Sequence, residues 1–422
     1  MRPAAHARVG EPERIRLRHV AAVQMGQSPP GDSYGTAAQA GLPFLQGTAD
    51  FGRPHPVPRV YCSNPGKVAS SGDILFSVRA PVGELNMADR EFCIGRGLCA
   101  VRVRHRLLRS YAWWALHAVR EQLRVEATGS TFDAVTAEEV GDLRVPVPPR
   151  SQQRAIADFL DRETARIDRL IAEKERVLHL VAEKRQAVIT QAVTRGLDPK
   201  APLRASGVEW LGEIPAHWDA LKIAYFARVG NGCTPARDNA SYWEGGSFPW
   251  LNSAVVNNPT VGDPPDFVTD VALRECHLPL VEPNSVLVAI TGQGKTRGKA
   301  SLLTYRSTIN QHMAYITPNA TRAAPRFVQL ALTAAYDVLR FISDDTGSTK
   351  GALTCEQICH FKLALPPPHE QEAIRKHLDA QVTKLDALHT AATETIGLLR
   401  ERRAALIAAA VTGAIDVRAE VT

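Results

Sequence analysis

The 422-residue sequence has no uninterrupted apolar run long enough to cross a bilayer, and its first residues, MRPAAHARVGEPERIRL, have no apolar core. These absences argue against a membrane protein and against a signal peptide or membrane anchor at the start of the sequence. The seven cysteines are an odd number and are scattered. A disulfide framework is therefore not expected, and a reducing cytoplasm is the default location.

Lysine is nearly missing from the first 150 residues, where Lys67 is the only one and the remaining basic side chains are arginines. The whole chain carries a formal net charge of +6 and is 45% hydrophobic, which suits folded domains with ample cores and argues against disorder. The positive charge permits binding to nucleic acid without requiring it. Arginine forks suit phosphates and guanine edges, although a high-GC genome would enrich arginine equally well.

No catalytic or metal-binding motif is complete. AITGQGKT (289–296) ends like a phosphate-binding P-loop, but Ala289 stands where the first glycine belongs and the following residues look like a strand. We interpret this segment as a basic glycine-rich loop and keep a stand-alone P-loop-like nucleotide hydrolase as an alternative function. Cys355, Cys359 and His360 lack a second Cys/His pair at zinc-finger spacing, so we predict no metal site and no catalytic residue.

The sequence does contain a long repeat. Residues 152–194 match residues 370–412 at a shift of 218 without a gap, so that Gln153 falls on Gln371 and Leu160 on Leu378. Apolar residues recur at seven-residue spacing in both copies, which is typical of a helix that packs along a partner helix. Because a helix of some forty residues is poorly stable alone, we predict that the two copies pack as an antiparallel coiled coil.

The regions before the two helices are also related. TGSTFDAVTAEEVGDLRVPVPP (128–149) matches TGSTKGALTCEQICHFKLALPP (346–367), GQSP (26–29) recurs as GCTP (232–235), and the strand-like GDILFSV (72–78) recurs as NSVLVAI (284–290). Short β-rich runs between Gly and Pro turns predict strands. The predicted fold is α+β, with two similar β-rich domains (1–150 and 199–368) joined by two long helices (151–198 and 369–418) in an internal pseudo-twofold repeat.

These features together resemble the specificity (S) subunit of type I restriction–modification enzymes. The resemblance is carried by the paired TGST…PP segments, by the helix starts PPRSQQRAIADFLD and PPHEQEAIRKHLD, and by SGVEWLGEIPAHW (206–218). It extends from about Arg14 to Asp416, and the first domain has no copy of the WLGEIPAHW segment. The resemblance implies a non-catalytic subunit with two target-recognition domains, each reading one half of a bipartite DNA site.

The resemblance also implies the partners. The helices would set the spacing between the two half-sites and dock two methyltransferase (M) subunits, and restriction (R) subunits would join where they are present. S-adenosylmethionine, ATP and Mg would belong to those partners, so we expect no cofactor in this chain. Double-stranded DNA is the expected ligand, and no membrane is involved. A coiled-coil scaffold without a DNA role is the other alternative function.

Candidate DNA-binding residues lie in loops that the repeat places at related positions. The TGST loops offer hydroxyls and backbone amides for phosphates, and the loops after the strong strands add basic side chains. Amide and hydroxyl side chains elsewhere suit base edges. The predicted set is Gln27, Arg79, Arg96, Thr128, Ser130, Thr131, Asn252, Ser253, Lys295, Arg297, Lys299, Gln311, Thr346, Ser348, Thr349 and Lys350. The alternative for the TGST segments is a capping turn before a helix, since Ser and Thr cap readily.

Overall fold

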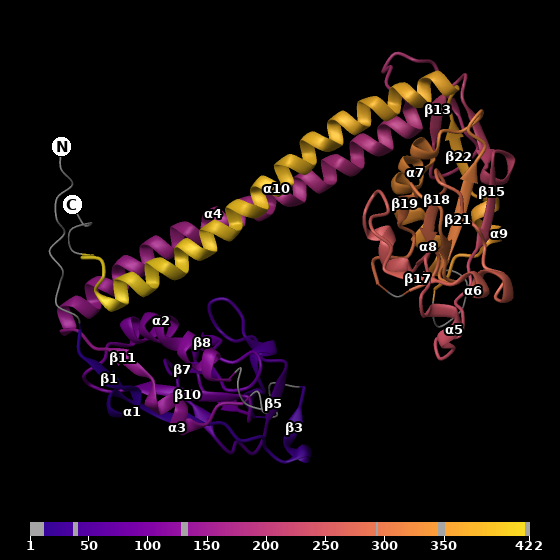
Figure 1. Cartoon of the computed structure of the whole chain (residues 1–422). Helices are drawn as coiled ribbons and strands as arrows, with labels where there is room; N and C mark the ends of the chain where they lie inside the picture. The colour runs from indigo at the N-terminus through magenta and orange to yellow at the C-terminus, as the bar shows by residue number, and fades with distance from the viewer. Residues whose placement is uncertain (1–11, 37–40, 128–133, 293, 345–350, 418–422) are drawn as a thin grey trace. The chain divides into compact units, whose positions relative to one another are not determined.

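The structure is a computed structural model, and it describes residues 12–36, 41–127, 134–292, 294–344 and 351–417, with the side chains of 121–127 left aside. The chain divides into unit 1 (Met1–Glu175 and Thr393–Thr422) and unit 2 (Arg176–Ala392), which are described separately. Each unit holds a β-rich domain and part of both long helices (Figure 1). Within the described residues, no helix combines the length and the apolarity that crossing a bilayer requires.

Unit 1 contains a four-stranded sheet in the order β2-β10-β7-β8, a five-stranded sheet in the order β3-β5-β4-β9-β6, and the pair β1-β11. Its elements are β1 (Arg14–Arg16), α1 (Leu17–Val20), β2 (Ala21–Met25), β3 (Tyr34–Gly35), β4 (Leu42–Leu45), β5 (Val60–Cys62), β6 (Val68–Ala69), β7 (Ile74–Ser77), β8 (Leu85–Met87), β9 (Phe92–Ile94), β10 (Leu98–Val103), α2 (Arg109–Ala127), α3 (Ala137–Asp142), β11 (Arg144–Pro146) and the beginning of α4 (Arg150–Arg195).

Unit 2 contains the corresponding four-stranded sheet β15-β21-β18-β19, the sheet β17-β16-β20, and the pairs β14-β22 and β12-β13. Its elements are β12 (Leu203–Ala205), β13 (Glu213–Pro215), β14 (Asp219–Lys222), β15 (Ala227–Asn231), α5 (Ala240–Trp243), β16 (Phe248–Leu251), β17 (Asp266–Val268), α6 (Asp270–Glu275), β18 (Val286–Ala289), β19 (Ala300–Leu302), β20 (Thr308–Ile309), β21 (Met313–Pro318), α7 (Pro325–Ala334), α8 (Tyr336–Asp344), α9 (Cys355–His360), β22 (Lys362–Leu365) and the beginning of α10 (Pro368–Thr412).

The predicted relation between the two domains is confirmed in their four-stranded sheets, which have the same strand order. Leu75 of β7 faces Ala100 of β10, and Leu287 of β18 faces Tyr315 of β21, in antiparallel pairs that occupy the same place in the two four-stranded sheets. The sheet interiors are filled by the apolar residues of these strands, most of which are buried in both units. The segments after the TGST loops also match, since α3 and α9 begin with the capping boxes Thr136/Glu139 and Thr354/Gln357.

The two predicted long helices are α4, with 46 residues, and α10, with 45 residues, and they pack side by side (Figure 1). Ion pairs between the helices show the antiparallel direction, because Asp168 pairs with Arg403 at 3.0 Å and Glu175 pairs with Arg400 at 3.1 Å. The Glu175–Arg400 pair is exposed, whereas Arg403 of the other pair is partly buried, and exposed pairs add little stability. The helices are held mainly by buried apolar residues, among them Leu160 and Ile167 in unit 1 and Ile189, Leu378 and Val382 in unit 2.

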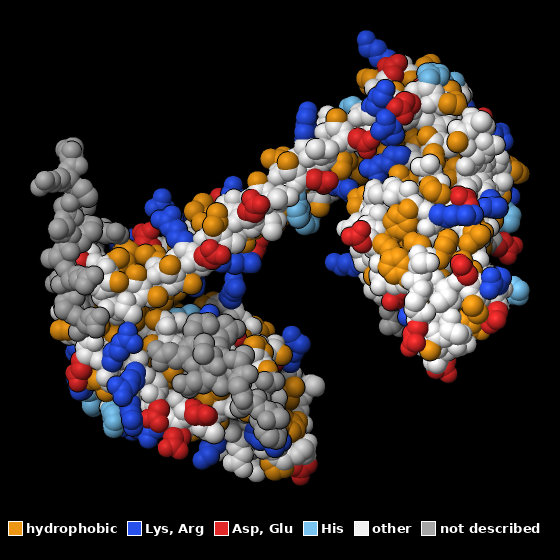
Figure 2. All heavy atoms as spheres, viewed as in Figure 1, with side chains coloured by type: hydrophobic (Ala, Val, Ile, Leu, Met, Phe, Trp, Pro, Cys, Tyr) orange, Lys and Arg blue, Asp and Glu red, His pale blue; other side chains and the backbone are white. Residues whose placement is uncertain are grey.

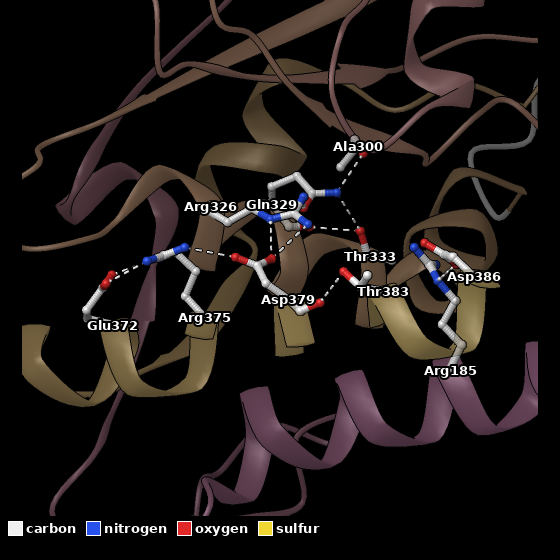
Figure 3. A network of polar contacts seen from close by, with 10 residues as sticks. All are labelled: Arg185, Ala300, Arg326, Gln329, Thr333, Glu372, Arg375, Asp379, Thr383 and Asp386. Carbon is white, nitrogen blue, oxygen red and sulfur yellow. Dashed lines mark hydrogen bonds and ion pairs between the residues drawn. The ribbon is translucent and has the colours of Figure 1, made fainter. Parts of the chain in front are cut away.

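In unit 2, a polar network ties α10 to the domain (Figure 3). Arg326 of α7 donates from Nε and Nη2 to the Asp379 carboxylate of α10, at 3.3 and 3.2 Å. Arg375 donates to the other oxygen of Asp379 at 2.8 Å and also to Glu372, whose pKa it lowers to about 2. The Asp379 carboxylate is therefore contacted by two guanidinium groups. In unit 1 the matching Asp161 accepts a hydrogen bond from the indole of Trp114 at 2.9 Å instead.

Unit 2 also has a hairpin, β12–β13, that the described part of unit 1 lacks. It leads into Trp218, which is 1% exposed and packs among residues from the end of α4 and the beginning of α10. Its indole Nε1 donates to Glu370 at 2.9 Å, and His217 lies 2.7 Å from the same carboxylate. The WLGEIPAHW segment therefore fastens both long helices to the second domain.

Candidate nucleic-acid interface

Among the described strands, each unit has one pair that runs parallel, and the two pairs are equivalent. In unit 1, Phe44 and Leu45 of β4 pair with Cys93 and Ile94 of β9. In unit 2, Trp250 and Leu251 of β16 pair with Thr308 and Ile309 of β20. Because the strands of each pair run in the same direction, the residues that follow them emerge at the same edge. Those residues are Gln46 and Arg96 in unit 1, and Asn252 and Gln311 in unit 2.

A third segment reaches this edge from the four-stranded sheet. The turn after β2 is held by a hydrogen bond from Gln27 N to Ile94 O of 2.8 Å, and the turn after β15 by one from Cys233 N to Ile309 O of 3.0 Å. A side chain at Gly26 or Gly232 would collide with a backbone carbonyl of the parallel pair. Glycine therefore lets the predicted GQSP and GCTP turns lie directly against the strand ends.

In unit 1 the three segments bring together Ser28, Gln46 and Arg96. The Ser28 hydroxyl lies 3.4 Å from Gln46 Oε1 and accepts a hydrogen bond from Arg96 Nε at 3.4 Å. Gln27, Gln46 and Arg96 are exposed. We call Ser28, Gln46 and Arg96 cluster 1. The sequence prediction included Arg96 and the neighbouring Gln27. It missed Ser28 and Gln46, although Ser28 lies within the repeated GQSP turn.

In unit 2 the equivalent positions hold Thr234, Asn252 and Gln311, which we call cluster 2. The Thr234 hydroxyl donates to Gln311 Oε1, and Gln311 Nε2 lies 3.5 Å from Nε2 of His312. Asn252 Oδ1 accepts from the Ala254 backbone at 2.9 Å and caps the short helix Ser253–Asn257, so the predicted Ser253 is the first residue of that helix. The prediction named Asn252 and Gln311 and missed Thr234.

The chain that returns from each TGST segment runs beside its cluster. Arg79 forms an isolated antiparallel bridge with Ala134, and Thr291 forms the equivalent bridge with Ala352. Arg79 is exposed, while the Thr291 hydroxyl bonds His312 Nδ1 at 2.7 Å. The predicted residues Thr128, Ser130, Thr131, Thr346, Ser348, Thr349 and Lys350 lie outside the described residues, so their contact with DNA stays a prediction.

The comparisons with known proteins agree with this repeated architecture. The sequence model described as "Type I restriction modification DNA specificity domain" matches residues 64–179 and 215–397, which together make up more than half of the chain. The chain belongs to this family. The family predicted from the TGST…PP segments and the helix starts is therefore confirmed.

Named relatives include specificity subunits. The chain is 39% identical over 137 residues to one assigned to the type I restriction enzyme MjaX of Methanocaldococcus jannaschii, which covers 32% of each chain. It is 25% identical over 268 residues to the EcoR124I/EcoR124II specificity subunit of Escherichia coli, covering 61% of this chain and 59% of that one. The chain thus spans about a third and about three-fifths of the lengths of these two relatives.

Two solved structures share the fold. One comes from a structural study of the complex assembly and conformational transition of the type I R-M system, with a TM-score of 0.75 and 17% identity over 97% of this chain and 100% of that chain. The other is the HsdS subunit from Thermoanaerobacter tengcongensis, with a TM-score of 0.51 and 18% identity over 98% of this chain and 100% of that chain. At these identities the likeness shows the fold alone.

In this specificity-family chain, the basic residues predicted on the β18–β19 connection differ in their exposure. Lys295 is exposed, and Lys299 is partly exposed and donates to Asn257 Oδ1 at 3.0 Å. Arg297, by contrast, is 3% exposed and pairs with Asp344. The predicted contact between Arg297 and DNA is disfavoured, because its guanidinium is buried and its charge is compensated by a carboxylate.

The β18–β19 connection also argues against the alternative that the chain is a P-loop-like nucleotide hydrolase. After β18 the described chain turns and enters β19, which pairs antiparallel with β18. A P-loop needs a helix at this point, because the helix N-terminus and the backbone amides hold the phosphates. The Gly294-Lys295-Thr296 motif is therefore in the wrong structural context. The seven cysteines are free thiols, and Cys355 and Cys359 lie on the short helix α9.

Positive charge is not gathered into one face in the view of Figure 2, where Lys and Arg side chains are scattered among neutral and acidic ones on both units. In unit 1 the exposed cationic residues near cluster 1 include Arg79, Arg96 and Lys67, whose carbonyl accepts a hydrogen bond from Ile94 N at 2.9 Å. A patch of this kind adds some attraction to phosphates but leaves most of the selectivity to hydrogen bonds. The arrangement is suited to recognition, with polar side chains held on rigid strand ends.

Proposed function

We propose that this chain is the DNA-recognition (specificity) subunit of a type I restriction–modification complex, in which each domain reads one half of a bipartite DNA site. The observation that supports this most directly is the pair of equivalent clusters. The two domains share strand order and turn geometry, but cluster 1 carries Ser, Gln and Arg where cluster 2 carries Thr, Asn and Gln. A shared frame with different exposed side chains suits two different half-sites.

The catalytic steps belong to partner subunits under this proposal. Two methyltransferase subunits would dock on the long helices, bind S-adenosylmethionine and modify the target base, and restriction subunits would supply the steps that use ATP and Mg. Exposed apolar side chains on the helices support docking there, including Leu180 and Leu388 in unit 2 and Leu398 in unit 1. DNA as the ligand and seven free thiols support a cytoplasmic location.

Two other functions are separable from this one. A nucleotide hydrolase would show ATP turnover by the purified chain that Lys295→Ala abolishes, and the strand β19 after the motif argues against it. A coiled-coil scaffold would show no sequence-selective DNA binding in the presence of a methyltransferase partner. Binding that is selective for sequence and weakened by salt would exclude the scaffold.

The decisive experiment exchanges one domain. Residues 200–368 are replaced by the equivalent domain of a relative with a known half-site, the chimera is expressed with its methyltransferase subunit, and methylated bases are mapped across the genome. We expect one half of the recognised sequence to change to that of the donor while the other half is retained. A change in both halves, or in neither, would contradict the assignment of one half-site to each domain.

A further inference from the structure

We infer that clusters 1 and 2 are base-reading sites and that they read different bases, a guanine through Arg96 in unit 1 and an adenine through Gln311 in unit 2. This inference rests on the proposed DNA-recognition function and deepens it. Arg96 and Gln311 stand at the same place in their domains, two residues beyond the end of the second parallel strand. A difference in side chain at one position of one frame is the simplest source of a difference between half-sites.

The backbone around both positions is fixed by the same hydrogen bonds. Gly95 N donates to Leu45 O at 2.8 Å, and Asn310 N donates to Leu251 O at 3.0 Å. Val78 N donates to Gly97 O at 2.9 Å, as Ile290 N does to His312 O. The residue between these bonds, Arg96 or Gln311, therefore starts from a backbone that is tied on both sides. Such support lowers the entropic cost of placing a side chain against a base edge.

Arg96 has the chemistry of a guanine reader. Among the described residues its one hydrogen-bond partner is the Ser28 hydroxyl, which receives Nε. That contact orients the guanidinium plane and leaves the two Nη groups for a ligand. Guanine presents two acceptors, O6 and N7, in the major groove, and an arginine fork meets both. Gln46 is exposed beside Ser28 and offers a further amide at the same edge.

Gln311 has the chemistry of an adenine reader. Its amide carries one acceptor and a pair of donors, which match the N6 donor and N7 acceptor of adenine. Thr234 donates to its Oε1, and His312, held in turn by Thr291, lies beside its Nε2. These contacts fix which end of the amide faces which way, as Ser28 does for Arg96. Asn252, whose side-chain oxygen caps the helix Ser253–Asn257, adds a second amide at the same edge.

Contact with a phosphate is the competing role for Arg96, and the two roles predict different behaviour. Loss of a phosphate contact weakens binding to all sequences alike and reduces its salt dependence. Loss of a bidentate base contact relaxes the preference at one base pair, by roughly ten- to a hundredfold. Arg96→Lys separates the roles, since lysine keeps the charge and loses the fork.

The test uses the full chain co-expressed with its methyltransferase subunit and maps methylated sites in the host genome. Arg96→Gln and Arg96→Lys should each relax or change one base pair of one half-site, and Gln311→Arg should change one base pair of the other. Arg90→Gln is the matched control, because Arg90 is exposed, precedes the same strand β9, and should leave the pattern unchanged. Binding of the purified complex to a randomised DNA library provides a second readout for any variant that methylates poorly.

The outcomes distinguish a failure of the Arg96 and Gln311 assignments from a failure of the proposed DNA-recognition function. If the unaltered complex methylates a bipartite site and both Arg96 variants keep every base of it, the assignment of Arg96 is wrong while the proposed function stands. If the same base pair changes in the Arg96 and Gln311 variants, the assignment of one cluster to each half-site fails. If the unaltered complex shows no sequence preference in the methylome or the library, the proposed function itself fails, and this inference with it.

Discussion

Gln153 and Gln371, which lie 218 positions apart, are both fully buried and make the same three hydrogen bonds in their respective units. Gln153 accepts from Leu108 N at 2.7 Å and donates to the carbonyls of Arg106 and Pro148 at 2.9 and 2.8 Å. Gln371 accepts from Ala324 N at 2.7 Å and donates to the carbonyls of Arg322 and Pro366, both at 2.8 Å. Each glutamine joins the first turn of a long helix to the domain before it.

Replacing Gln153 with leucine should destabilise unit 1. The substitution leaves a backbone N–H and two carbonyls without partners in a buried place, and each unsatisfied group costs about 1–3 kcal/mol. We expect a loss of about 2–4 kcal/mol after partial relaxation and access of water. Urea denaturation of the full chain measures it, and Gln191→Leu on the exposed face of the same helix is the control. Equal stability of the two variants would show that the hydrogen bonds of Gln153 are not needed.

Replacing Trp218 with alanine should destabilise unit 2 without affecting unit 1. A buried tryptophan truncated to alanine costs about 3–5 kcal/mol, and here the hydrogen bond to Glu370 is lost as well. Trp218→Phe keeps much of the apolar contact and should cost less. Hydrogen exchange of the intact chain, read separately for the strands of each unit, gives the measurement. Faster exchange in the strands of unit 1 would contradict the local role of this side chain.

His117 of α2 should make unit 1 sensitive to acid. Burial, with a smaller contribution from the Arg120 and Arg403 charges, lowers the pKa of His117 to about 4. The unfolded chain, with an ordinary histidine pKa near 6.5, binds the proton more readily, so this contribution is complete above about pH 6.5 and is lost as the pH falls toward 4. The cost at pH 5 should reach up to about 2 kcal/mol.

The check compares denaturation at pH 7 and pH 5 for the native chain and for His117→Gln, which cannot take up a proton. Glutamine can still donate a hydrogen bond to the carbonyl of Trp113, which the histidine Nδ1 contacts at 2.9 Å. We expect the variant to lose less stability between the two pH values. The same pH dependence in both proteins would show that other groups cause it.

Under the proposed function, the length of α4 and α10 sets the distance between the two half-sites on the DNA. Removing seven residues from each helix shortens it by about 10 Å and, because seven residues are close to two turns, keeps the apolar stripe in register. We expect the mapped site to keep the bases of both half-sites and to lose part of the unread gap between them. A gap of unchanged length would count against the helices as the spacer.

The sequence was sufficient for the long helices and for the repeat, because a heptad pattern and a shift of 218 are local, regular signals. It was insufficient for the clusters, because loops of different length change the shift. The shift is 206 between Gln46 and Asn252 and 215 between Arg96 and Gln311, so no single shift matches all three residues of cluster 1 to those of cluster 2. The burial of Arg297 depends on Asp344, 47 residues away, and such a pairing has no signature in the sequence.

The parallel strand pairs at the clusters are joined by bonds between backbone groups, and these bonds do not depend on which side chains follow the strands. Under the assignment above, a substitution at Gln46, Arg96 or Gln311 would alter recognition at little cost in folding. New recognition could then arise by single codon changes as well as by exchange of whole domains. Two strains whose genes for this chain differ at one such codon should carry different epigenetic marks on otherwise identical genomes.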